Sequence, residues 1–183
     1  MKTWLFLCAA WLVIPAGIGR TEGQPASPSL TPRLASFKER LAVAESVRVK
    51  TDLLGIELDW ELEAARHQLD KWLAPGRPSK EPVEGDEGER KVLCELKETD
   101  FASIFLKADE QNRVIYMIGV LRPGKEIPFA SIGEVEKAPV RTDHEIAWDV
   151  VRPNKSLLRV VANGSNSKAA SITIFAVRPK LPR

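Results

Sequence analysis

The sequence contains two histidines, and their neighbours decide whether either could do chemistry. His67 follows Glu63 by four residues and precedes Asp70 by three, so on a helix these side chains would share one face. A neutral imidazole beside carboxylates could bind a metal ion. The same spacing suits a solvated helix face on which opposite charges pair, and we prefer this interpretation. His144 stands between two acids in a segment expected to be extended, where neighbours point to opposite faces. We therefore predict no metal site and no cofactor.

Signatures of nucleophilic catalysis are missing from the sequence. It has no Gly-x-Ser-x-Gly elbow and no glycine-rich phosphate loop. Cys94 has no evident histidine partner and is interpreted as a buried, inert thiol. We predict no catalytic residue. The many carboxylates leave one alternative open, a carboxylate-dependent hydrolase of an envelope polymer, with or without His67.

An arginine followed by proline closes three expected strands, and this recurrence suggests binding. The cations at these three places are Arg122 and Lys125, Arg152 and Lys155, and Arg178 and Lys180. Proline lacks the N–H that a strand needs, so it ends each one. If these strands run in the same direction, the cations would gather at one end of the sheet. There they could bind phosphate or carboxylate groups of an envelope polymer, a lipid headgroup or a protein. Alternatively, the arginines merely cap exposed strand ends in water.

Aromatic residues could add a sugar-binding surface to such a patch. Trp72 falls on an expected core stripe, where aromatic residues more often serve packing. Trp60 stands at an expected helix start and should be exposed. The candidate binding residues are therefore Arg122, Lys125, Arg152, Lys155, Arg178 and Trp60.

The charge of the chain is nearly balanced. Its formal net charge is +2, and loss of an N-terminal leader would remove Lys2 and leave +1. Such a chain has no global field that would attract nucleic acid or a membrane. We expect no nucleic-acid partner, and any electrostatic partner must recognise a local patch.

The N-terminus has the pattern of a secretory signal peptide over 1–19. A lysine precedes the almost wholly apolar stretch Trp4–Ile14, and small residues stand before Arg20. That stretch is shorter than the roughly 20 residues of a membrane-spanning helix. A retained anchor is the alternative. We expect export to the periplasm or the extracellular space, with no transmembrane segment after cleavage. Cys94 would then be the only cysteine, which excludes an internal disulfide.

Two helices are expected after a flexible linker over 20–31, which is rich in Pro, Ser, Gly and Thr. Apolar residues at three- and four-residue steps predict the first helix over 32–47. The second should begin with Asp59 as its N-cap. Its expected buried face consists of Leu62, Ala65, Leu69, Trp72 and Leu73. The charged segment 75–90 is predicted to be a mobile loop.

Alternation of apolar residues then predicts strands. Three antiparallel strands are expected around 92–96, 101–106 and 113–121. A helical turn at 129–135 and strands at 146–151, 157–162 and 171–177 should follow. The pair Asn163-Gly164 predicts a tight turn between the last two strands.

A helical segment, a loop and three strands occur twice in this order, which suggests two imperfect repeats, 53–123 and 128–179. The first contains Gly55-Ile56-Glu57-Leu58, a cap and Leu62-Glu63-Ala64-Ala65, followed by a strand meander. This pattern resembles the small secreted α+β modules typified by the β-lactamase inhibitory protein and the outer-membrane assembly lipoprotein BamE. The resemblance covers about 53–121, and more loosely 129–177. It implies a binding module rather than an enzyme.

The sequence as a whole predicts a single α+β domain over 32–183, with N-terminal helices packed on an antiparallel sheet. Its predicted function is that of an exported, non-enzymatic binding module of the cell envelope or extracellular space. The expected partner is a protein or an anionic envelope component. A third possibility is that the sheet mainly mediates self-association.

Overall fold

The computed structural model describes residues 44–73, 82–84 and 88–177 of the 183-residue chain. All of them belong to one unit, Ala35–Arg183. Several predictions lie outside the described residues. They are the signal peptide, the linker, most of the helix 32–47, much of the loop 75–90, and Arg178.

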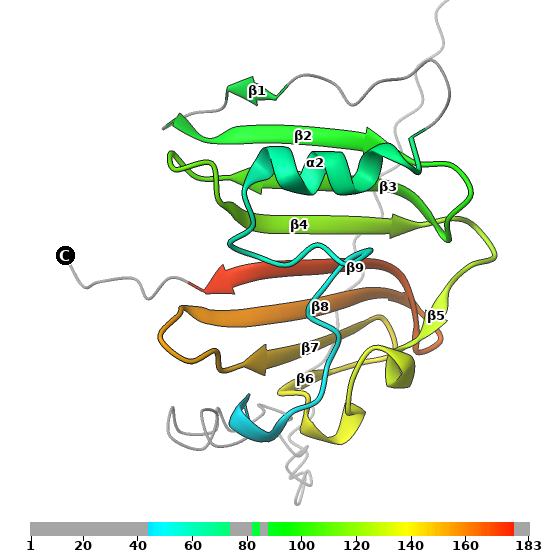
Figure 1. The fold of residues 1–183 in the computed structure, drawn as a ribbon. Coiled ribbons are helices and arrows are strands. Elements are labelled where there is room, and N and C mark those ends of the chain that lie inside the picture. Colours follow the sequence, from blue (N-terminus) through cyan, green and yellow to red (C-terminus); the bar gives the residue numbers. More distant parts are fainter. Residues whose placement is uncertain (1–43, 74–81, 85–87, 178–183) are drawn as a thin grey trace, which may run out of the picture. The chain divides into compact units, whose positions relative to one another are not determined.

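The described chain is dominated by one antiparallel sheet of nine strands (Figure 1). The strands are β1 (Val83–Glu84), β2 (Arg90–Glu95), β3 (Phe101–Ala108), β4 (Val114–Leu121), β5 (Ile127–Pro128), β6 (Val140–Arg141), β7 (Glu145–Val150), β8 (Leu157–Ser165) and β9 (Lys168–Val177). Their order is β1-β2-β3-β4-β9-β8-β7-β6, and β5 pairs with the start of β9. Two meanders, β1–β4 and β6–β9, therefore join where β4 pairs with β9. They lie within 53–123 and 128–179, whose status as repeats stays a prediction.

The predicted α+β fold with N-terminal helices packed on the sheet is wrong. In the part of the chain that the structure describes, the only complete α-helix is α2 (Leu62–Asp70), joined by two 3-10 turns, η2 (Phe129–Ser131) and η3 (Val135–Lys137). Residues 44–46 are helical, but the chain then runs extended across the sheet as far as Glu61 (Figure 1). β-Branched residues at alternate positions, Val47, Val49 and Thr51, favour this extended crossing over a helix. We call residues 47–61 the crossing segment.

The helix α2 begins later than predicted, and Asp59 is not its N-cap. Asp59 has a positive φ of 71°, and the N-cap is Glu61, which makes no side-chain capping bond. Two backbone hydrogen bonds of 2.8 Å join Asp59 N to Val114 O and Val114 N to Trp60 O. The start of the helix is thus fixed by β4. Its buried residues are Leu62, Ala65 and Leu69, as predicted, whereas Trp72 and Leu73 follow the helix and are half-buried.

The hydrophobic core lies between the sheet and the layer formed by α2 and the crossing segment. A tight turn at Leu54 and Gly55, both with positive φ, lets Leu53 and Ile56 exchange two backbone hydrogen bonds of 3.0 Å. Both flanking side chains are fully buried. Below the turn, a Cβ on Gly119 of β4 would lie 2.6 Å from a ring carbon of Phe101. The absence of a side chain at Gly119 therefore leaves room for the Phe101 ring, and Leu53 Cδ1 of the crossing segment would lie 3.3 Å from the same Cβ.

The strand predictions are largely confirmed, with shifts at their ends. The antiparallel meander β2–β3–β4 matches the predicted alternation. β1 lies inside the segment predicted as a loop. The last hairpin turns at Asn166 and Ser167, which have φ of 52° and 57°, rather than at Asn163-Gly164. Gly164 instead forms a bulge, where a Cβ would lie 1.9 Å from Lys168 O.

Among the residues that the structure describes, no helix has the length and apolar character needed to cross a membrane.

Candidate functional site

The predicted basic residues do not gather at one end of the sheet. β4 is antiparallel to β9, whereas β7 and β9 run in the same direction because both are antiparallel to β8. Arg122 and Lys125 follow β4 and lie at one end; Arg152 and Lys155 follow β7 and lie at the other (Figure 1). Arg178 falls outside the described residues.

The cations after β4 bond within the domain. Arg122 is half-buried, and its guanidinium donates to Leu96 O and, at 3.0 Å, to Thr99 O. Lys125 Nζ lies 3.3 Å from Asp100 Oδ1. These contacts tie the end of β4 to the loop between β2 and β3.

At the opposite end, three predicted site residues do come together around Asp59. Its Oδ2 accepts a hydrogen bond from the guanidinium of Arg152 at 2.8 Å and forms an ion pair with Lys155 Nζ at 3.0 Å. Trp60 is the next residue and is 37% exposed. Since the carboxylate of Asp59 already neutralises charge here, the contacts tie the crossing segment to the turn after β7. Their part in binding stays a prediction.

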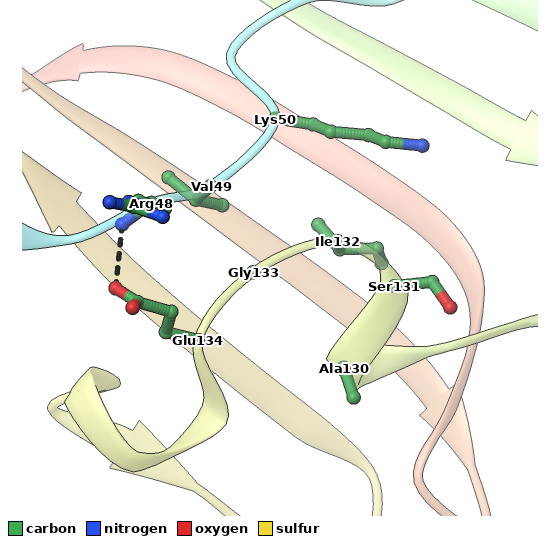
Figure 2. Close-up of a pocket in the computed structure, with 8 residues that line it drawn as sticks. All are labelled: Arg48, Val49, Lys50, Ala130, Ser131, Ile132, Gly133 and Glu134. Atoms are coloured by element: carbon green, nitrogen blue, oxygen red, sulfur yellow. Dashed lines mark hydrogen bonds between the residues drawn. The ribbon is translucent and has the colours of Figure 1, made fainter.

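A shallow depression of about 420 Å³ lies where the crossing segment meets the loop after η2 (Figure 2). Arg48 N donates to Glu134 Oε2 at 2.9 Å, and Lys50 N donates to Ile132 O at 2.8 Å. The Lys50 side chain points away from Glu134 in Figure 2. Little of the depression is enclosed, so it serves mainly to join two segments of backbone.

The acidic side chain in this junction is held ionised. The backbone N–H of Arg48, followed by the hydrogen bond from Lys137, lowers the pKa of Glu134 below its ordinary value of 4.5. Backbone hydrogen bonds likewise lower the pKa of Glu126. A general acid for hydrolysis needs a raised pKa, so neither residue suits that role.

The helix residues weighed as metal ligands pair with each other or with arginine. His67 Nδ1 lies 3.1 Å from Asp70 Oδ2, whereas Glu63 binds Arg66 at 2.9 Å. Within 44–73, 82–84 and 88–177, no group of three potential metal-ligating side chains is present.

The sheet has a second face, opposite α2 and the crossing segment. In Figure 1 both of these lie on the near side, and most buried strand residues point towards them. On β4, for example, Met117 and Leu121 are buried, while Tyr116, Ile118 and Val120 point to the other side. On β7, however, Ala147 and Asp149 point to the opposite side and are buried as well. No other described helix lies over that side, which we call the far face.

Strand register aligns the far-face side chains in three rows. The central row is Leu93, Phe105, Ile118, Thr173, Val161 and Ala147 on β2, β3, β4, β9, β8 and β7. The lysine row, on one side, is Lys91, Lys107, Tyr116, Phe175, Arg159 and Asp149. The glutamate row, on the other, is Glu95, Ser103, Val120, Ser171, Asn163 and Glu145. Apart from its threonine, the central row is entirely apolar.

Large apolar side chains in these rows contact one another and remain accessible. The Tyr116 ring packs edge-on against Phe105, with centroids 6.3 Å apart, and tilted against Phe175 at 6.0 Å. Leu93 is 41% exposed and Val120 is 42% exposed. Contiguous exposed apolar surface of this kind is a candidate contact site for another molecule.

A buried ion pair closes one end of the lysine row. Arg159 Nε lies 2.6 Å from Asp149 Oδ1, and its NH2 lies 3.1 Å from Oδ2, so the pair is bidentate. Asp149 is only 4% exposed. The hydrogen bond to this carboxylate raises the pKa of Arg159. The pair is therefore fully charged and compensated within the sheet.

Sequence reasoning missed the far face because it treated the non-core positions of each strand as ordinary exposed positions. A signal was present: Ile118 and Val120 of β4 are apolar at positions facing away from the core, as are Phe105 and Phe175. Strands with one solvated face normally carry polar residues there.

The chain matches no known protein family, curated protein or solved structure in the comparisons made. The resemblance to the β-lactamase inhibitory protein and BamE stays a prediction.

Proposed function

We propose that this chain is an exported, non-enzymatic binding module that docks a protein on its far face. Export rests on the signal-peptide pattern of residues 1–19. The observation that carries the binding role is the central row, an apolar strip that crosses six strands on the side away from α2.

A protein fits this face better than an anionic polymer or headgroup. Lys91 and Lys107 both lie against Glu89, and Arg159 is bound by Asp149, so all three cations of the lysine row are already paired. An anionic ligand would find little uncompensated charge here. A protein with a flat apolar strip would bury the central row and gain roughly 25 cal/mol for each Å² of apolar surface.

The test is capture from native envelope extract on the immobilised full chain, over a salt series. Binding driven by apolar burial should survive high salt, because salt screens charges without weakening that burial. The variants Leu93→Asp and Val120→Asp place a charge at positions that are more than two-fifths exposed, so the fold should tolerate them. Each should abolish capture of the partner.

Ser131→Asp is the matched control, since it adds the same charge at an exposed position of η2, outside the far face. It should leave capture unchanged. Capture that fades with salt, or that persists in both far-face variants, would contradict the proposal. Circular dichroism of each variant verifies that the sheet is intact.

A further inference from the structure

The charges of the two flanking rows identify a partner for the far face. We propose that the face binds a second copy of this chain, sheet against sheet, about a twofold axis that runs along the central row. This inference rests on the proposed docking function and specifies its partner.

A twofold axis in the interface determines which rows face each other. An axis lying in the interface along the central row leaves each strand opposite its own counterpart and exchanges the two sides of the row. The lysine row of one copy then faces the glutamate row of the other. The central rows pack on each other between them, as the inner faces of aligned β-sandwiches do at a separation of about 10 Å.

This arrangement is complementary in charge and in apolar character. On β2, Lys91 faces Glu95 of the second copy, and symmetry provides this contact twice. On β3, Lys107 faces Ser103, and on β4, Tyr116 faces Val120. Opposite charges thus face each other at the β2 end of the rows, and apolar side chains face each other at their centre.

The end of the rows on β7 is the least favourable point, because Asp149 there faces Glu145 of the second copy. Its charge is already compensated by the bidentate contact with Arg159. The repulsion between the two carboxylates is correspondingly reduced.

The other twofold axis in the interface, parallel to the strands, would place each row against itself. Glu95 would then face Glu145, Lys107 would face Arg159, and Lys91 would face Asp149. The first two are like-charge contacts, which cost free energy at an interface, and only the third is an opposite-charge contact. The axis along the central row is therefore preferred.

The far face is also large enough for a dimer. Three rows on six strands contain 18 residues, and 16 of them, all except the buried Ala147 and Asp149, are accessible on each copy. A stable interface uses roughly 20 to 30 residues on each side, so the face approaches the lower end of this range.

Sedimentation velocity of the purified full chain over a concentration series tests the inference. We expect a monomer–dimer equilibrium. Lys91→Glu and Glu95→Lys should each raise the dissociation constant about tenfold, because each places two like-charge contacts in the dimer. The double variant Lys91→Glu/Glu95→Lys should return the dissociation constant to the wild-type value, since opposite charges face each other again.

Glu95→Lys separates the two axes. It weakens the dimer if Glu95 faces Lys91, but strengthens it if Glu95 faces Glu145 of the second copy. A chain that is monomeric at every concentration, a tighter dimer with Glu95→Lys, or a double variant no better than the singles would overturn the inference. The proposed docking function fails separately, by the extract experiment. A monomer that still captures a protein through the far face overturns only the dimer.

Discussion

Gly133 is the residue over which the crossing segment passes most closely. It forms a bridge with Val49, and a Cβ at Gly133 would lie 2.8 Å from Val49 Cγ2 and 3.0 Å from Trp148 Cε2. Trp148 is fully buried, and its indole N–H donates to Glu134 O at 2.9 Å, so the ring cannot move aside without loss of that bond. The absence of a side chain at Gly133 therefore allows the crossing segment, the loop after η2 and β7 to pack together.

Gly133→Ala should destabilise the domain by about 1–3 kcal/mol, the usual cost of overpacking a well-packed site. The free energy of unfolding, measured by urea titration, gives this cost. Combining it with Val49→Ala should recover part of the loss, because that change removes the nearest atom. Wild-type stability in Gly133→Ala would mean that the crossing segment does not pack at this point.

Besides backbone hydrogen bonds, an acidic side chain joins the crossing segment to the loop between η2 and η3. Glu134 Oε2 accepts a hydrogen bond from Arg48 N at 2.9 Å and lies 3.0 Å from Lys137 Nζ. Lys137 Nζ in turn donates to Ser46 O at 2.7 Å. The ionised carboxylate thus connects the segment to the loop on both sides.

This contact should make stability depend on pH in a defined direction. The folded pKa of Glu134 is lowered from 4.5, so its contribution is present above about pH 4.5 and is lost as the pH falls through the folded pKa. Glu134→Gln should therefore reduce the free energy of unfolding at pH 7, and the difference from wild type should shrink by pH 3. Urea titrations of both proteins at pH 7 and pH 3 measure this difference in the free energy of unfolding.

Glu136→Gln is the matched control for this element. Glu136 lies two residues away, is highly exposed, and contacts Arg141 at 3.3 Å. Surface pairs of this kind contribute little. If both variants showed the same pH dependence, the contact with the Arg48 backbone would not be its source.

The elements differ in how far the sequence predicted them. The alternation of apolar and polar residues predicted β2 to β4 and β7 to β9, because one face of each strand packs on the core. The apolar residues Leu62, Ala65 and Leu69, spaced at three and four positions, predicted α2. The crossing segment was not predicted, because Val47 fits both the apolar spacing of a helix and the alternating pattern of an extended strand. The far face was missed too, since its rows arise from pairing between β4 and β9, which are about 50 residues apart in sequence.

At the scale of the whole molecule, the two meanders share one core. β4 and β9 pair along the seam, and a continuous cluster of buried residues extends from α2 to Trp148 on β7. A core that spans both meanders should unfold in one cooperative step. Cys94 can report on this step, because it is fully buried on β2, and burial raises the pKa of its thiol to about 11.

A thiol reagent at pH 8 should modify Cys94 only when the domain opens, because the reactive thiolate is both scarce and inaccessible in the folded state. Cys8→Ser leaves Cys94 as the only thiol. In this background, Gly133→Ala disturbs packing against Trp148 of β7, in the other meander, yet it should speed labelling of Cys94 tenfold for each 1.4 kcal/mol that it removes from the free energy of unfolding. Unchanged labelling in this variant would mean that β2 opens independently of β7, and the seam between β4 and β9 would then separate two folding units rather than join one.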